Sequence, residues 1–158
     1  MPSGVNSKII MDYNAVNIEF IDSPSSEQIK ELSNEFLSFS KSKLPDLPPE
    51  SEDKIFMVNA RSESGELQGG ILANCYWNGL EIDTLWVSDS QRGKGLGSEL
   101  LTKAEEFGIE NGAVISYLKT MEAKVFYDKS GYEVYGVLED RPIGTLLYHM
   151  KKRLAENS

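Results

Sequence analysis

The glycine-rich segment SDSQRGKGLGS, residues 88–98, constrains the fold more than any other feature of this chain. It follows a run of strand-forming residues at 80–87 and precedes a stripe of apolar residues at helical spacing. Three glycines at alternate positions let the backbone adopt φ values that other residues avoid and let it approach a ligand closely. The first-turn amides of the helix and its dipole favour an anion, and Arg92 and Lys94 add formal positive charge. The pattern predicts a strand–turn–helix unit that binds a phosphate or diphosphate.

The two standard nucleotide motifs do not fit this segment. A P-loop places Lys and then Ser or Thr after its last glycine, whereas Gly97-Ser98 lacks the lysine. A dinucleotide fingerprint has the spacing G-x-G-x-x-G within a parallel βαβ unit, but the spacing here is G-x-G-x-G. The preceding strand also follows a hairpin signal, Asn78-Gly79, in which both residues tolerate the positive φ of a type I′ turn.

The remaining pattern predicts a mixed α/β, or α+β, fold with helices covering a sheet. Ser25 and Gln28 form a capping box for a helix that ends before Pro45, and Asn111-Gly112 ends the helix after the glycine-rich turn. Residues 1–14 are weakly patterned, and we expect a loose arm there. The predicted strands are 16–21, 55–60, 67–77, 80–87, 113–117, 132–138 and 145–152, and a short further helix is predicted at 121–129.

Composition limits the partners of the chain. Its 158 residues fit one domain, and 16 Lys and Arg against 25 Asp and Glu give a net charge of −9, which argues against nucleic acid. No apolar run approaches the ~20 residues of a membrane span, and we expect no membrane association and a cytoplasmic location. Cys75 and His149 are each the single residue of their type, so we expect no disulfide framework and no metal site. Residues 1–66 hold 12 acidic and 6 basic side chains, which form either a solubilising surface or the border of a site for a cationic substrate.

Arg92-Gly93-Lys94-Gly95-Leu96-Gly97 resembles motif A of the GNAT acyltransferases, R/Q-x-x-G-x-G/A. Residues 123–132, AKVFYDKSGY, resemble the A-x-x-F-Y-x-K-x-G-F/Y signature of the same family, and GVLEDRPIG with LYHMKKRL resembles its closing strands. The likeness covers residues 54–154, and 15–53 match only in their β-α order.

The resemblance implies a single GNAT domain over residues 1–158, with a mostly antiparallel sheet of about seven strands flanked by helices. It implies acetyl-CoA as cosubstrate, held between the splayed strands 80–87 and 113–117, and no metal. Main-chain groups of three residues would pair with the pantetheine arm: Leu85, Trp86 and Val87. Seven residues would hold the diphosphate: Arg92, Gly93, Lys94, Gly95, Leu96, Gly97 and Ser98. A homodimer is a further expectation from the family.

The candidate catalytic residues are Glu81, Asp83 and Tyr127. Alternation along the strand predicts Glu81 and Asp83 on one face, together with Leu85 and Val87. Glu81 falls where histone-type members of the family carry their general base; its alternative is a solvent-exposed residue beside the hairpin turn. Tyr127 matches the tyrosine that acts as general acid in the family; its alternative is a tyrosine packed on the sheet.

We therefore expect an N-acetyltransferase that acts on a primary amine of a small acceptor, and the acidic N-terminal half is compatible with a cationic one. Two alternatives stay open. The first is acetylation of a protein lysine or N-terminus, which requires a peptide groove. The second is an inactive CoA-binding regulatory module, against which the presence of Glu81, Asp83 and Tyr127 argues. Thr120 stands where many members carry Asn, and its hydroxyl can still donate a hydrogen bond.

Overall fold

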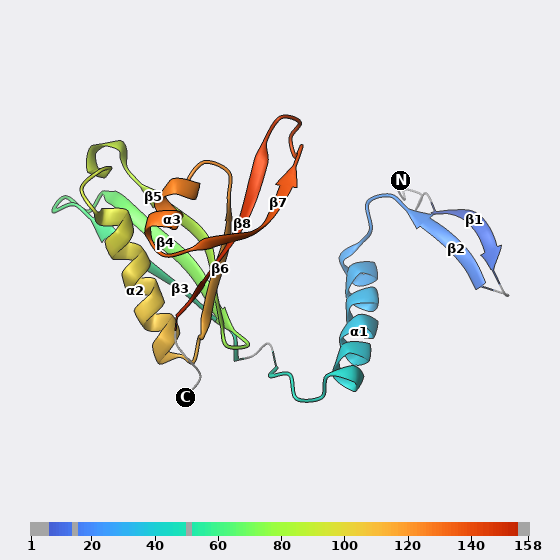
Figure 1. Ribbon diagram of the computed structural model, residues 1–158. Helices are drawn as coiled ribbons and strands as arrows, with labels where there is room; N and C mark the ends of the chain where they lie inside the picture. The colour runs from blue at the N-terminus through green and yellow to red at the C-terminus, as the bar shows by residue number, and fades with distance from the viewer. Residues whose placement is uncertain (1–6, 14–15, 50–51, 155–158) are drawn as a thin grey trace. The chain divides into compact units, whose positions relative to one another are not determined.

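The computed structural model describes residues 7–13, 16–49 and 52–154 and divides the chain into two compact units, Met1–Leu47 and Pro48–Ser158 (Figure 1). That both units belong to one domain stays a prediction. None of the described helices combines the length and the apolar character needed to cross a membrane.

The first unit consists of a strand pair and one helix. Strands β1 (Ser7–Tyr13) and β2 (Val16–Ile21) pair antiparallel, so the expectation of a loose arm is wrong for residues 7–13. Residues 1–6 and 14 of that expectation lie outside the described residues. Helix α1 (Ser26–Lys43) begins with the predicted capping box: the Gln28 amide donates to Ser25 Oγ at 3.2 Å, and the Ser25 amide donates to Gln28 Oε1 at 2.8 Å.

The second unit is built on a six-stranded mixed sheet in the order β3-β4-β5-β6-β8-β7. Its only parallel pair within the described residues is β5–β6, and the other four pairs are antiparallel. The mixed sheet with flanking helices confirms the predicted fold class. The strands are β3 (Lys54–Arg61), β4 (Leu67–Tyr76), β5 (Gly79–Val87), β6 (Ile115–Thr120), β7 (Glu133–Glu139) and β8 (Leu146–Arg153).

The β4–β5 hairpin turns one residue earlier than the sequence predicts. Positive φ values fall on Trp77 (+47°) and Asn78 (+62°), and Gly79 already pairs with Tyr76 as the first residue of β5. Gly79 does not supply a positive φ. A side chain there would crowd a neighbouring ring, because its Cβ would lie 3.2 Å from Cε1 of Tyr117. The predicted hairpin is confirmed, and its register is corrected.

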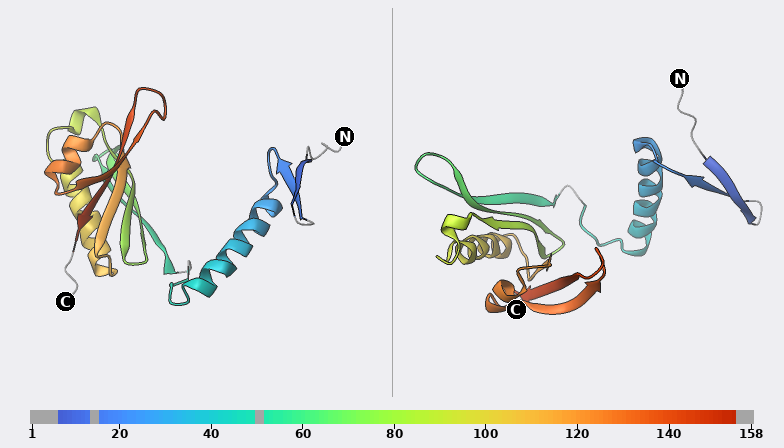
Figure 2. Two further views of the ribbon diagram at one scale, coloured as in Figure 1. Left: turned by 45° about the vertical axis from the view of Figure 1, so that its right-hand side comes forward. Right: turned by 90° about the horizontal axis from the view of Figure 1, so that it is seen from above.

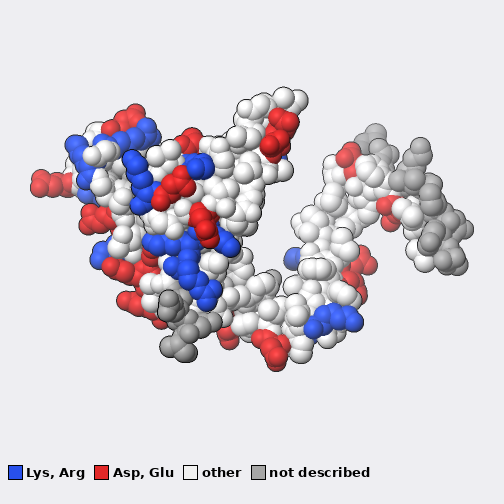
Figure 3. Space-filling view, viewed as in Figure 1, with Lys and Arg blue, Asp and Glu red and all other residues white. Residues whose placement is uncertain are grey.

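Helices α2 (Leu96–Glu110) and α3 (Lys124–Lys129) cover one face of the sheet (Figures 1 and 2). Leu101 and Ala104 of α2 and Tyr127 of α3 join one core with Ile71, Leu80 and other buried residues of the strands. Gly112 adopts φ +86° just after α2 and ends the helix, as predicted. On the face of this unit seen in Figure 3, acidic and basic side chains are interspersed.

Candidate functional site

The separation of β5 from β6 creates the site. The two strands pair at only three positions, Gly79–Ile115, Leu80–Ser116 and Glu81–Tyr117, and then diverge (Figures 1 and 2). The splay was predicted, although β6 runs over Ile115–Thr120 and not over 113–117. Beyond Glu81 and Tyr117, the edges of β5 and β6 that face each other therefore border an opening, while their other edges stay paired with β4 and β8.

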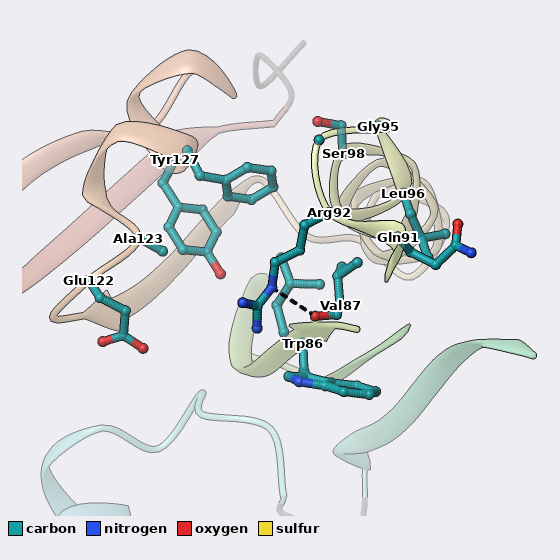
Figure 4. Close-up of a pocket in the computed structure, with 14 residues that line it drawn as sticks. Trp86, Val87, Gln91, Arg92, Gly95, Leu96, Ser98, Glu122, Ala123 and Tyr127 are labelled. Carbon is teal, nitrogen blue, oxygen red and sulfur yellow. Dashed lines mark hydrogen bonds between the residues drawn. The ribbon is translucent and has the colours of Figure 1, made fainter. Parts of the chain in front are cut away.

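A first cavity of about 710 Å³ lies at the open end of the splay, between the glycine-rich turn and α3 (Figure 4). It is lined by Leu85, Trp86, Val87, Gln91, Arg92, Gly93, Gly95, Leu96, Gly97, Ser98, Glu122, Ala123, Phe126 and Tyr127. All residues named from the sequence as cofactor-binding line it except Lys94. Four of the lining residues were not named from the sequence: Gln91, Glu122, Ala123 and Phe126. Ala123 and Phe126 belong to the motif at 123–132, and Gln91 and Glu122 each lie directly beside a motif residue, so proximity to the two motifs was the available signal.

The glycine-rich turn presents free backbone amides to this cavity. Gly93 and Gly95 have φ of +75° and +88°, and a Cβ added at either would meet no atom within 4 Å. Gly95 is the N-cap of α2 and has no side chain to cap the helix. The amides of the first turn lack intrahelical partners and point outward. The open space and the helix dipole together fit an anion with several oxygen atoms.

Arg92 is held beside the turn by two contacts. Its Nε donates to the backbone oxygen of Val87 at 3.1 Å (Figure 4), and its Nη1 lies 2.6 Å from Oδ1 of Asp89. Asp89 offsets part of the positive charge that the sequence suggested, so the backbone amides carry much of the attraction for an anion. Arg92 also links the end of β5 to the turn, which fixes the shape of the cavity at this point.

Tyr127 reaches into the same cavity from α3. Its side chain is buried, it packs edge-on against Phe126 and Tyr132, and its hydroxyl points into the cavity (Figure 4). Burial, with a smaller contribution from the charge of Glu122, raises the pKa of Tyr127 to about 12. The phenol therefore keeps its proton at neutral pH.

Glu81 and Asp83 do not follow the predicted alternation. The register between β4 and β5 shifts between Leu72 and Ala73, which pair with Thr84 and Ile82, so Asp83 is an extra residue in a β-bulge. Ile82, which precedes the bulge, faces the core on the α2 side. Leu85 and Val87, which follow the bulge, pack against the core on that same side. The prediction that Glu81 shares a face with Leu85 and Val87 is therefore wrong, because the bulge inverts the alternation.

Glu81 lies at the centre of a hydrogen-bonded cluster with two tyrosines. The Tyr117 hydroxyl donates to Tyr76 Oη at 2.6 Å, the Tyr76 hydroxyl donates to Oε2 of Glu81 at 3.2 Å, and Oη of Tyr117 lies 3.3 Å from the same Oε2. Burial raises the pKa of Tyr117 far above its usual range, and the Tyr76 hydrogen bond and the Glu81 charge add to this. The cluster orients the carboxylate, so Glu81 is not the freely solvated side chain that the alternative interpretation described. The sequence linked neither tyrosine to Glu81: Tyr76 was considered only as a residue that lines the substrate side or packs, and Tyr117 was missed.

A second cavity, of about 340 Å³, lies at the paired end of the splay and is lined by both Glu81 and Asp83. Asp83 in this cavity and Leu85 in the first cavity are two residues apart on β5, which is about 7 Å along a strand. β6 likewise supplies Tyr117, Leu118 and Lys119 to the second cavity, and residues just beyond its end line the first. The two cavities therefore adjoin where the strands part.

The remaining residues singled out from the sequence have ordinary surroundings. Cys75 is buried in the core, and burial raises the pKa of its thiol, which makes it a poor nucleophile. Oγ1 of Thr120 accepts from the Ala123 amide at 3.0 Å and so caps the turn before α3. His149 lies on β8, packs edge-on against Tyr135 and lines the second cavity.

A model of the "Acetyltransferase (GNAT) family" matches residues 26–132. Blasticidin-S acetyltransferase of Streptomyces morookaense is 35% identical over 104 residues, which span 64% of this chain and 76% of that protein. The crystal structure of an acetyltransferase from Bacillus cereus aligns with a TM-score of 0.75 and 30% identity, over 85% of this chain and 96% of that one. An aminoglycoside 6'-N-acetyltransferase solved with coenzyme A shares the fold at 23% identity, with a TM-score of 0.60 over 66% of this chain and 75% of that one.

Proposed function

Because this chain belongs to the acetyltransferase (GNAT) family and is an N-acetyltransferase, we propose that it moves an acetyl group directly from acetyl-CoA to the primary amine of a small acceptor. The observation that carries the proposal is the pair of adjoining cavities at the β5–β6 splay. One offers an anion cradle and the other offers a carboxylate held by hydrogen bonds. Direct transfer requires two such sites to meet at one point.

The first cavity fits acetyl-CoA in shape and in chemistry. The amides of Gly97 and Ser98 would hold the diphosphate, and the open sites at Gly93 and Gly95 leave room for its oxygens. Backbone groups of Leu85, Trp86 and Val87, which lie at the open end of β5, would bind the pantetheine arm. Bound there, acetyl-CoA supplies an activated acyl group, a thioester.

Glu81 is the general base of the proposal. An amine is protonated at neutral pH and attacks only after losing that proton. Glu81 faces the second cavity, and the hydrogen-bonded chain from Tyr117 through Tyr76 holds its carboxylate in one orientation, so it can take the proton directly or through a water molecule. Asp83 is the extra residue of the β-bulge, two positions after Glu81, and it is exposed. We therefore propose that it attracts the ammonium group of the acceptor.

Tyr127 is the group that faces the leaving sulfur in this proposal. A phenol with a pKa of about 12 is a weaker acid than a thiol, whose ordinary pKa is about 8.5. Complete transfer of its proton to a thiolate would cost about 5 kcal/mol by this difference of roughly 3.5 pKa units. Tyr127 therefore stabilises the sulfur by donating a hydrogen bond. The nitrogen loses its second proton to solvent water as the C–S bond breaks, and the departing thiolate gains a proton from solvent.

The size of the second cavity supports a small acceptor over a protein substrate. Cavities for small molecules typically span about 300–1,000 Å³, and this one is near the lower limit. That the relative from Streptomyces morookaense acts on blasticidin-S favours the same conclusion. The cytoplasmic location and the homodimer stay predictions.

The test is release of free thiol from acetyl-CoA in the presence of small primary amines, with the acetylated amine identified by mass spectrometry. We expect amine-dependent release for the unaltered protein. Glu81→Gln should lower kcat by about 100-fold or more while acetyl-CoA affinity is retained. Glu63→Gln, in an exposed turn between β3 and β4, is the matched control and should not change kcat. Absence of thiol release with every amine, or an unchanged rate for Glu81→Gln, would contradict the proposal.

A further inference from the structure

The second cavity carries charges of both signs, and the proposed function uses only the negative ones. β5 contributes Glu81 and Asp83. The positive charges are Lys119 from β6 and Arg141 from the turn between β7 and β8, and the imidazole of His149 on β8 lines the same flank. In the strand order β5-β6-β8-β7, the acids lie on one flank of the opening and the bases on the other.

These charges are not paired with one another. The four ion pairs found within residues 7–13, 16–49 and 52–154 all lie elsewhere: Arg92–Asp89, Lys103–Glu106, Lys124–Asp128 and Lys152–Glu105. Opposite charges that line one concave surface but do not neutralise each other leave a field directed across the cavity. A ligand with one charge of each sign would satisfy both flanks at once.

We propose, on the basis of the proposed function, that the acceptor is a small amino carboxylate, with its amine toward Glu81 and Asp83 and its carboxylate toward Lys119 and Arg141. The direction follows from the reaction. The amine must reach the thioester, which would lie beside the Leu85 end of β5, and Asp83 lies about 7 Å from Leu85 along that strand. The carboxylate then extends to the flank away from β5.

Arg141 is the residue best suited to the distal carboxylate. A guanidinium group can form two parallel hydrogen bonds with a carboxylate, and Arg141 makes no ion pair with another described residue. Tyr135 and Leu147 also line the cavity, and they offer apolar surface to the carbon chain that joins the two charged groups. This arrangement explains why a chain with a net charge of −9 places basic side chains around a site for an amine.

The experiment compares three kinds of probe of matched length: ω-amino carboxylates, alkylamines and diamines. Steady-state rates with acetyl-CoA give kcat/KM for each probe, and calorimetric titration gives the affinity of each probe without turnover. We expect kcat/KM for an amino carboxylate to exceed that of the alkylamine of equal length by about tenfold to a hundredfold, the value of one charged hydrogen-bonded pair. Diamines should be poorer than either.

Charge reversal at Arg141 tests the assignment. Arg141→Glu should transfer the preference from amino carboxylates to diamines, whereas Arg153→Glu makes the same change of charge on β8 outside the cavity and should leave the preference as it was. Turnover of amines without any preference for a carboxylate, or an unchanged preference in Arg141→Glu, would overturn this inference and leave the proposed function standing. Binding of amino carboxylates without turnover of any amine would overturn the proposed function and support the cavity assignment. Neither binding nor turnover would overturn both.

Discussion

Replacing Gly95 by alanine isolates the anion cradle from the rest of the fold. Gly95 is the N-cap of α2 and has φ +88°, in the left-handed region, and a Cβ there would meet no atom within 4 Å. The substitution therefore causes backbone strain without a steric clash. The added methyl group would project into the space where diphosphate oxygens approach the first-turn amides.

Two magnitudes follow from this geometry. The left-handed conformation costs an alanine about 1–2 kcal/mol, so the melting temperature should fall by about 2–8 °C. Loss of one charge-assisted hydrogen bond to the diphosphate costs about 1.5–3 kcal/mol, so the Kd for acetyl-CoA should rise by about 10- to 150-fold.

Gly65 provides a matched control for the strain. It also has φ +88°, also has no atom within 4 Å of an added Cβ, and lies in the β3–β4 turn away from both cavities. Calorimetric titration with acetyl-CoA and thermal unfolding should be run on both variants. We expect similar losses of melting temperature and a loss of affinity in Gly95→Ala alone. An unchanged Kd in Gly95→Ala, or an equal loss in Gly65→Ala, would refute the role of the cradle.

Three further predictions concern packing, the base and pH. Gly108→Ala would place a Cβ 3.1 Å from Cδ2 of Leu80 in the core. This overpacking should lower the free energy of unfolding, measured by chemical denaturation, by about 1–3 kcal/mol. An unchanged free energy of unfolding would show that Leu80 can move aside. Tyr117→Phe removes the hydroxyl that donates to Tyr76, the donor to Glu81, and should lower kcat with little change in the Kd for acetyl-CoA, whereas an equal change in both would assign Tyr117 to cofactor binding. The pKa of Tyr127 is raised in the folded state from 10 to about 12, so its contribution to stability is complete below pH 10 and lost as pH rises toward 12. The loss should approach about 3 kcal/mol, and a Tyr127→Phe variant with the same alkaline decline would contradict it.

Local rules account for the parts of the structure that the sequence predicts well. The capping box of Ser25 and Gln28, the glycine-rich start of α2 and the Gly112 stop each depend on residues only a few positions apart. Short-range hydrogen bonds and allowed φ values decide such features, so single residues indicate them. The same holds for the first cavity, where Leu85–Val87 and the glycine-rich turn lie close together along the chain and were therefore predicted together.

Features set by distant contacts were shifted or missed. The hairpin turn falls on Trp77 and Asn78, and the glycine that the sequence placed in the turn instead lies beside the ring of Tyr117 from another strand. The bulge at Asp83 depends on the register with β4, which alternation along one strand does not reveal. Arg141 joins Glu81 in one cavity only because the order β5-β6-β8-β7 brings their segments together. Periodicity assigns faces, but it does not assign neighbours across a sheet.

The most direct test of the account is to follow backbone amide resonances by NMR while acetyl-CoA is added. We predict saturable shifts concentrated at residues 85–87 and 93–98, with the amide of Gly65 unaffected. Saturable binding with shifts confined to other residues would contradict the placement of acetyl-CoA between β5 and α3. The absence of any shift at high acetyl-CoA concentration would contradict its use as the acetyl donor.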